Sequence, residues 1–371
     1  MQKIRVADYV ASFIKKIGVD CVFMVPGGGA MFLNDAIQSK KNLDYVANHN
    51  EQASSIAAEA YSRVTENIGV AVVTTGPGST NAITGVAGAS IESVPLMIIS
   101  GQVKRSDLKG KSGVRQIGPQ EVDIVSIVKS ITKYATTIKN PKNIRLELEK
   151  AYHQATTGRK GPVWIDIPLD IQAAPIEPTK LIGLKKLSNK KNSVKLFNKY
   201  DEIINLVNSS KRPIILAGHG IRLSKASKDF TKMCKILKIP VVTTWNAMDL
   251  LPNSSKLNIG KPGTVALRAP IFAIQNSDLL ISIGARLDNV VTAYNPQNFA
   301  KNAKKIIVDI DLNELNKFKI KIDLKINLDA KFFIEKLNDK AAKNKIKSFS
   351  DWLKKCNDWK KRYTINDGKN F

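Results

Sequence analysis

The chain has 371 residues, 43% of them hydrophobic, which is enough for two domains with globular cores. No apolar run reaches membrane-spanning length, and residues 1–20 follow an amphipathic helical pattern rather than that of a signal peptide, so we expect a cytoplasmic protein without a membrane partner. The net charge of +26 comes mainly from dispersed lysine with no recognition motif beside it, so we expect no nucleic-acid partner either.

Apolar strands alternate with glycine-rich turns near the start of the chain. Residues 21–25 (CVFMV) are a predicted strand that leads into PGGG at 26–29. Residues 69–75 (GVAVVTT) are another, followed by GPGSTN at 76–81 and a small-residue helix over 82–90. Strand-to-loop junctions of this kind are typical of an open α/β sheet, which binds ligands at its strand ends.

A carboxylate stands between these two strands in the sequence. Residues 43–47 are predicted to form a short buried strand, and Glu51 begins the alanine-rich helix that follows. Apolar residues at helical spacing predict that this helix buries the face that Glu51 introduces: Ala53, Ile56, Ala57, Ala60 and Val64. A buried carboxyl group can exchange a proton near neutral pH, and the alternative role for Glu51 is to complement the helix dipole.

An ordered set of motifs resembles the thiamine-diphosphate-dependent enzymes, and within them the large catalytic subunit of acetolactate synthase. The resemblance runs from residue 4 to about residue 317. Its motifs are PGGG at 26–29, NHNEQAS at 48–54, AAEAYSR at 57–63, TTGPGSTN at 74–81, SVPLMIISGQV at 93–103 and GPVWIDIP at 161–168. The resemblance implies thiamine diphosphate as the cofactor.

The resemblance also implies roles for single residues. The glutamate that matches Glu51 hydrogen-bonds the aminopyrimidine ring and favours the tautomer that takes the proton from the thiazolium C2. The cofactor then acts as the electron sink for decarboxylation of a 2-keto acid. Thr74, Pro77 and Asn81 match positions along the pyrimidine half of the cofactor.

The substrate side is less typical of that family. Gly28 and Gly29 match the loop that faces the reacting carbon, and Gln120 matches a substrate-side glutamine. However, Pro119 stands where the family usually has phenylalanine, and the loop at 104–118 is long and basic. A lysine usual after GPVxIDIP is also absent. These departures favour an acceptor other than a second pyruvate, such as a sugar.

A second α/β module is predicted beyond a proline- and lysine-containing linker at 175–193. It extends over 194–330, and the first domain covers 1–174. Its predicted strands run into glycine or acidic turns and lie at 213–217, 240–244, 278–283 and 305–310.

The resemblance connects the second module with a flavin. Arg159, Arg286 and Asp309 match positions that the family uses around FAD. The usual Met-His-Gly segment is replaced by TVAL at 264–267. Both a flavin-bound domain and a domain without ligand therefore stay open.

The end of the chain matches no third domain of that family, whose Gly-Asp-Gly motif holds Mg²⁺ and the cofactor diphosphate. Residues 331–371 are predicted to be a helical tail leading towards such a domain. We therefore expect the first two domains of a three-domain enzyme, either as a fragment or as half of a split enzyme. The three scattered histidines predict no metal site in the chain itself.

The predicted fold class is α/β, with two doubly wound parallel-sheet domains, one binding the pyrimidine and one Rossmann-like. The predicted reaction is decarboxylation of a 2-keto acid, pyruvate being the first choice, and ligation to a second carbonyl. The alternatives are a simple keto-acid decarboxylase and a non-catalytic binding module that lacks the diphosphate domain. From the resemblance we also expect a homodimer or tetramer, with a keto acid or a sugar as acceptor.

Overall fold

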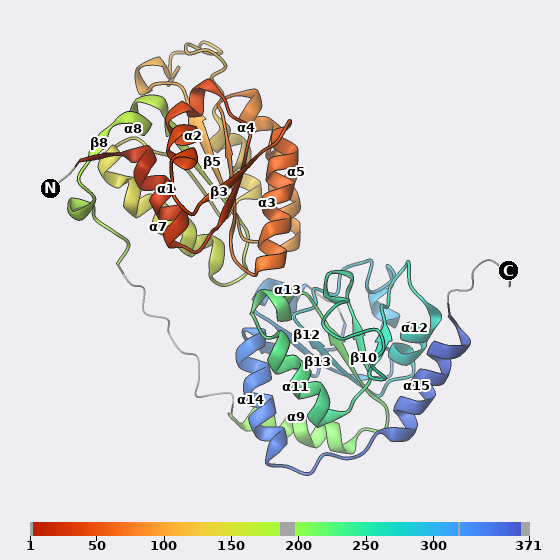
Figure 1. Cartoon of the computed structure of the whole chain (residues 1–371). Coiled ribbons are helices and arrows are strands. Elements are labelled where there is room, and N and C mark those ends of the chain that lie inside the picture. The colour runs from red at the N-terminus through yellow and green to blue at the C-terminus, as the bar shows by residue number, and fades with distance from the viewer. Residues whose placement is uncertain (1–2, 186–196, 318–319, 365–371) are drawn as a thin grey trace. The chain divides into compact units, whose positions relative to one another are not determined.

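Two compact units make up the chain, Met1–Ser188 and Asn189–Phe371. The computed structural model describes residues 3–185, 197–317 and 320–364. Within these residues each unit has a six-stranded, fully parallel sheet with helices on both faces (Figure 1). The prediction of two doubly wound α/β domains is confirmed. None of the described helices combines the length and the apolar character needed to span a lipid bilayer.

The sheet of the first unit has the strand order β3-β2-β4-β5-β7-β6. Its strands are β2 (Cys21–Met24), β3 (Asp44–Ala47), β4 (Gly69–Val73), β5 (Leu96–Gln102), β6 (Tyr134–Thr137) and β7 (Pro162–Pro168). One face is covered by α1 (Val6–Lys16), α2 (Met31–Gln38), α7 (Ile144–Thr156) and α8 (Leu169–Ala173). The other is covered by α3 (Glu51–Thr65), α5 (Ile83–Glu92) and α6 (Ile124–Val128). The short helix α4 (Pro77–Asn81) follows β4.

The second unit repeats this plan with the order β11-β10-β9-β12-β13-β14. Its strands are β9 (Pro213–Ala217), β10 (Val241–Thr243), β11 (Asn258–Gly260), β12 (Leu279–Ile283), β13 (Lys304–Asp309) and β14 (Leu324–Asn327). One face carries α9 (Phe197–Ser209), α10 (Gly220–Leu223), α11 (Ser227–Leu237) and α14 (Ala330–Ala342). The other carries α12 (Arg268–Gln275) and α15 (Ser350–Arg362), and α13 (Leu312–Asn316) follows β13.

The start of the predicted linker is part of the first unit. Strand β1 (Ile4–Arg5) pairs antiparallel with β8 (Pro175–Ile176). Ile176 and Leu181 are buried in the core of that unit. These apolar side chains give the segment a place in the core that a solvated linker would not have. Residues 186–193 of the predicted linker lie outside the described residues.

The predicted helical tail packs on the second unit as two helices. Phe333 and Leu337 of α14 enter the core on one face of the sheet. Trp352 and Cys356 of α15 enter the core on the other face. The Trp352 indole also donates a hydrogen bond to the carbonyl of Pro213, at the start of β9 (2.9 Å). Residues 365–371 lie outside the described residues.

Helix α3 buries a different face from the one predicted. Val64 is 83% exposed and Ile56 is 43% exposed. The buried residues are small or polar: Glu51, Ser54, Ser55, Ala58 and Ser62. The reason is close approach, because a Cβ on Gly69 would lie 1.8 Å from the carbonyl oxygen of Ala58. Only small side chains fit such a contact, so the larger apolar residues face outward. Strand β3, predicted to be buried, is an exposed edge strand for all four of its residues.

The contact between α3 and α5 makes a testable prediction. A Cβ on Gly85 would lie 2.3 Å from Oγ of Ser55, whereas one on Gly88 of the same helix would meet nothing within 4 Å. We expect Gly85→Ala to lower the free energy of unfolding by roughly 1–3 kcal/mol through overpacking. The matched control, Gly88→Ala, should raise it by roughly 0.5–1 kcal/mol through helix propensity. Urea unfolding of both variants tests this, and equal effects would contradict the close packing.

Candidate active site

The candidate site lies at the carboxyl edge of the first sheet. Glu51 comes after β3, Thr74 after β4 and Gly28 after β2, and these three strands are adjacent and parallel. The chain leaves β2 for β3 on one side and then returns to β4 on the other, so the order in which strands are added reverses between β2 and β4. Such a switch point is where open α/β sheets bind ligands.

Glu51 is the first residue of α3 and is 9% exposed. Its neighbour Asn50 caps the helix by accepting a hydrogen bond from the Gln52 N–H (2.7 Å). Asn81 donates through Nδ2 to Oε2 of Glu51 (3.0 Å). Hydrogen bonds among the described residues reach Oε2 and not Oε1. The Oε1 atom can therefore bond to a ligand.

Two glycine turns pack around Thr74. The Gly29 N–H donates to Oγ1 of Thr74 (3.0 Å). On the other side, a Cβ on Gly78 would lie 2.6 Å from Cγ2 of Thr74 and 3.2 Å from Oε1 of Glu51. A Cβ on Gly28, in contrast, would meet open space. Thr74 thus links the loop at 26–29 to the turn that carries Pro77, which is itself exposed.

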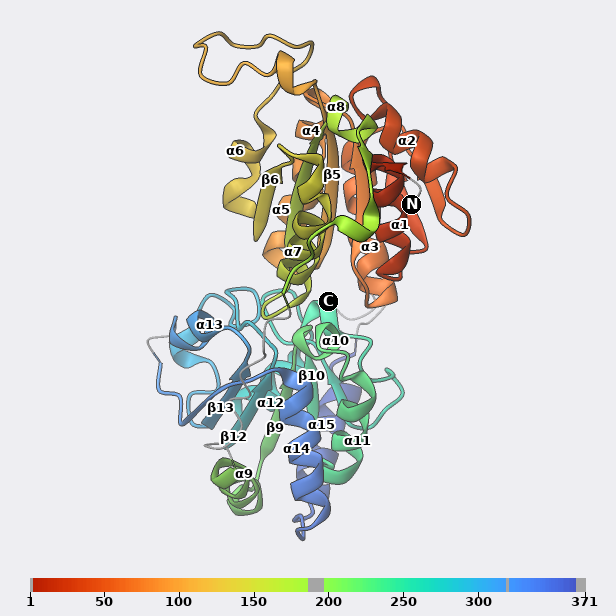
Figure 2. The ribbon, with the colours of Figure 1, turned by 90° about the vertical axis from the view of Figure 1, so that its left-hand side faces the viewer.

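Gln120 joins this group through its backbone. Its φ is +60°, and a Cβ on Gly76 would lie 2.2 Å from its carbonyl oxygen. The following residue, Glu121, is 7% exposed and accepts hydrogen bonds from the backbone N–H groups of Lys109 (2.6 Å) and Ile117 (2.9 Å). Figure 2 shows the resulting loop between β5 and α6 extending away from the sheet. The structure therefore brings all seven residues assigned to the first site to one edge: Gly28, Gly29, Glu51, Thr74, Pro77, Asn81 and Gln120.

A buried polar network under this edge has no assigned role in the sequence analysis. Asp166 of β7 is 1% exposed and accepts hydrogen bonds from side chains on the neighbouring strands, Ser100 (2.7 Å), Thr137 (3.0 Å) and Gln102 (3.3 Å). Burial raises the pKa of Asp166 to about 7, against the effect of these donors. The signal that could have located it is one aspartate within the otherwise apolar strand PVWIDIP.

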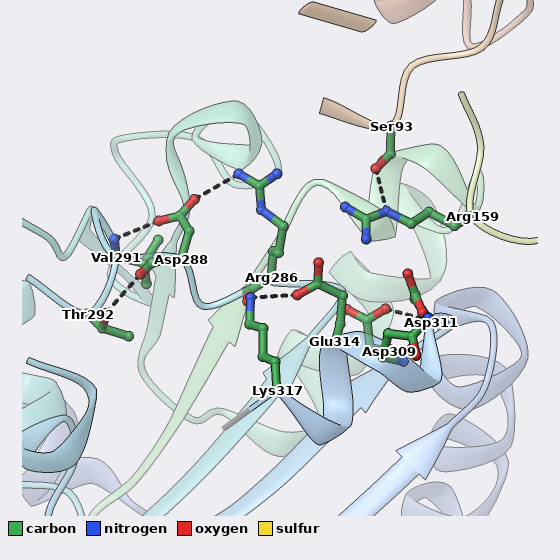
Figure 3. Close-up of polar contacts among 11 residues, drawn as sticks. Ser93, Arg159, Arg286, Asp288, Val291, Thr292, Asp309, Asp311, Glu314 and Lys317 are labelled. Atoms are coloured by element: carbon green, nitrogen blue, oxygen red, sulfur yellow. Dashed lines mark hydrogen bonds and ion pairs between the residues drawn. The ribbon is translucent and has the colours of Figure 1, made fainter. Parts of the chain in front are cut away.

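Arg286 and Asp309 lie at the carboxyl edge of the second sheet. Arg286 follows β12 and pairs with Asp288 (3.1 Å), and Lys317 donates to the Arg286 carbonyl (2.6 Å) (Figure 3). Asp309 ends β13 and accepts a hydrogen bond from the Asp311 N–H (2.9 Å). Each of these two residues is thus held by contacts within its own unit.

The glycine turns at this edge pack against each other. A Cβ on Gly218 would lie 2.0 Å from the carbonyl oxygen of Gly284. The N–H groups of Gly218, Gly220 and Gly284 donate to the carbonyls of Ile283, Gly284 and Val308, respectively. These three N–H groups are therefore not available to a flavin diphosphate.

Arg159 is placed apart from the Glu51 group. It precedes β7 and donates through Nε to Oγ of Ser93 (2.9 Å), which precedes β5 (Figure 3). Because the strands are parallel, both residues lie at the amino edge of the first sheet, opposite to Glu51. Among the described residues, no group of three or more His, Cys, Asp or Glu side chains could hold a metal ion.

Two doubly wound domains, one with a buried carboxylate at its switch point, define an α/β protein with a candidate ligand site at one sheet edge. Residues 4–127 match the N-terminal TPP binding domain of thiamine pyrophosphate enzymes, and residues 200–337 match the central domain. The chain therefore belongs to the thiamine pyrophosphate enzymes, whose N-terminal and central domains it carries. The family predicted from the motifs is confirmed.

Curated relatives include acetolactate synthases. The chain is 34% identical to the acetolactate synthase large subunit of Corynebacterium glutamicum, over 94% of this chain and 54% of the relative. It is also 34% identical to that of Lactococcus lactis, over 94% of this chain and 59% of the relative. A probable acetolactate synthase large subunit of Methanocaldococcus jannaschii is 33% identical over 96% of this chain and 59% of the relative. The chain thus spans less than two thirds of the length of these relatives.

Proposed function

We propose that the first unit forms the pyrimidine side of a thiamine diphosphate site in an acetolactate synthase-like enzyme. The observation that carries the proposal is the buried Glu51 carboxylate, with Oε2 held by Asn81 at 3.0 Å and Oε1 left for a ligand. The match of residues 4–127 to the TPP binding domain supports it. When bound, thiamine diphosphate supplies an electron sink for decarboxylation of a 2-keto acid.

In this proposal the residues of the chain bind and orient the cofactor, and one of them exchanges a proton with it. Oε1 of Glu51 would hold or release a proton beside the pyrimidine ring, and Asn81 keeps the carboxylate aimed through its hydrogen bond to Oε2. Glycine at 78 leaves room beside the carboxylate, since a Cβ there would lie 3.2 Å from Oε1 of Glu51 and 2.6 Å from Cγ2 of Thr74. Burial strengthens the hydrogen bond between this carboxylate and the ligand, because water competes less for the carboxylate in a low-dielectric site.

We propose pyruvate as the 2-keto acid and a second carbonyl, of a keto acid or a sugar, as the acceptor. Gln120 and the loop at 104–118 would face that acceptor. This loop carries several cations, and one of them, Arg105, is paired with Asp170 (2.7 Å). The alternatives remain a simple keto-acid decarboxylase and a non-catalytic binding module.

Other parts of the proposed enzyme lie outside this site. We propose Mg²⁺ as the ion that accompanies the cofactor diphosphate, and we expect a homodimer or tetramer. We leave a flavin out of the proposed mechanism, because the N–H groups of Gly218, Gly220 and Gly284 already bond to protein carbonyls. Because Arg159, Arg286 and Asp309 were connected only with a flavin, the proposed reaction uses none of them.

Product analysis tests this function. The 371-residue chain would be mixed with thiamine diphosphate, Mg²⁺ and pyruvate, with and without the unmatched part of the Lactococcus lactis relative as a separate polypeptide. We expect a hydroxy-keto product when both polypeptides are present. Release of free aldehyde would favour the decarboxylase. Absence of carbon dioxide release from the assembled pair would favour the binding module.

A further inference from the structure

The side chain of Gln102 contacts both segments that border the candidate site. It ends β5 and is 2% exposed. Its Oε1 accepts hydrogen bonds from Oγ1 of Thr75 (2.9 Å) and from the N–H of Val103 (3.0 Å). Its Nε2 donates to the carbonyl of Val122 (2.9 Å) and to Oδ2 of Asp166 (3.3 Å). One buried amide therefore uses both of its donors and both acceptor positions.

The partners of Gln102 belong to different parts of the site. Thr75 directly precedes Gly76, where the turn with Pro77 and Asn81 begins. Val103 and Val122 stand at the two ends of the loop that carries Gln120. The Asp166 carboxylate lies in the strand layer below, where Ser100 and Thr137 also bond to it.

We propose that Gln102 is a positioning residue, which holds the substrate-side loop at 103–123 and the turn at 74–81 in one fixed arrangement around Glu51. The amide acts through hydrogen bonds to other residues and does not touch the ligand. The meaning of this arrangement for catalysis rests on the proposed function, but the arrangement itself does not.

The geometry also explains why an amide occupies this position. Gln102 meets donors on one side, Thr75 and the Val103 N–H, and acceptors on the other, Val122 and Asp166. A carboxylate would bring its second oxygen against the acceptors, and an apolar side chain would deprive the Thr75 hydroxyl and the Val103 N–H of the acceptor that Gln102 supplies inside the protein. Buried polar groups without partners are costly, so the amide is the side chain that fits.

Hydrogen–deuterium exchange of the protein without cofactor tests this role. Gln102→Met fills a similar volume and removes every hydrogen bond of the amide. We expect exchange to become faster by about tenfold or more in peptides covering both 74–81 and 103–123, because buried hydrogen bonds are lost at both segments. Thr137→Val is the matched control, since it removes a donor to Asp166 and leaves Gln102 in place. We expect this variant to leave the exchange rates of both peptides unchanged.

A second variant separates the two contacts. Thr75→Val is isosteric and removes one donor to Gln102, so exchange should become faster at 74–81 and stay the same at 103–123. This variant also tests the proposal if Gln102→Met does not fold. Unchanged exchange in Gln102→Met, equal effects of Thr137→Val, or unchanged exchange at 74–81 in Thr75→Val would overturn the inference. Because no cofactor is present, failure of the proposed function would leave these results unaffected, and the two are distinguishable.

Discussion

Glu51→Gln is expected to slow proton exchange at C2 of bound thiamine diphosphate by roughly 100- to 10,000-fold, the range that a positioned acid or base contributes. A glutamine keeps the size of the side chain and its contact with Asn81 but cannot carry the proton. The fold should stay intact, because the buried carboxylate is replaced by a neutral group of the same shape. Nuclear magnetic resonance of the C2 proton in deuterated buffer measures this rate.

A matched control for Glu51→Gln lies two turns further along α3. Glu59→Gln makes the same chemical change in the same helix, where the carboxylate pairs with Arg63 instead of Asn81. It should leave C2 exchange within about twofold of the unchanged protein. Partly exposed ion pairs contribute little to stability, so this change should not disturb the fold. Equal rates for the two variants would remove Glu51 from its proposed role.

Asp166→Asn is expected to change how the stability of the first unit depends on pH. Burial raises the pKa of Asp166 from 3.8 to about 7, so the folded state binds its proton more tightly than the unfolded state. The stabilising contribution of the protonated group is therefore complete below about pH 4 and is lost as the pH rises to about 7. The loss amounts to roughly 4 kcal/mol. Asparagine does not titrate, so the stability difference between the two proteins should change by that amount across this window.

Hydrogen exchange of β5 and β7 at several pH values, corrected for the intrinsic rate, measures this difference. Asp170→Asn provides a control of opposite sign. Burial would raise the pKa of Asp170, but hydrogen bonds from Arg105 lower it overall. Its contribution should therefore be lost as the pH falls through that lowered pKa. A stability difference between wild type and Asp166→Asn that does not vary with pH would contradict the assignment of the raised pKa.

Much of the candidate site could be predicted because its residues stand in short motifs. The motif NHNEQAS places Glu51 at the start of a helix, and Thr74, Pro77 and Asn81 share one turn. The spacing between a strand, a glycine turn and a helix is local, so it can be read along the chain. The structure adds that Gly78 lies against Oε1 of Glu51, a contact between segments 27 residues apart.

The buried face of α3 could not be predicted in the same way. The apolar pattern favoured the side with Ile56 and Val64, yet the buried side carries serines. Helical spacing shows which residues share a face, but the distance to the neighbouring strand and helix decides which face fits. Here that distance is set by Gly69 and Gly85, which belong to other elements.

The sequence by itself determined the two α/β modules, the family and the carboxylate at the switch point, because each depends on residues that are near one another in the chain. Only the tertiary structure decided that Gln102 and Asp166 connect the turn, the loop and the strand layer. These contacts join residues that are 20 to 66 positions apart, since Gln102 and Asp166 meet Thr75, Val122 and Ser100 only after parallel strands align in the sheet. Parallel strands need long crossovers, so their side-chain partners cannot be read from local spacing.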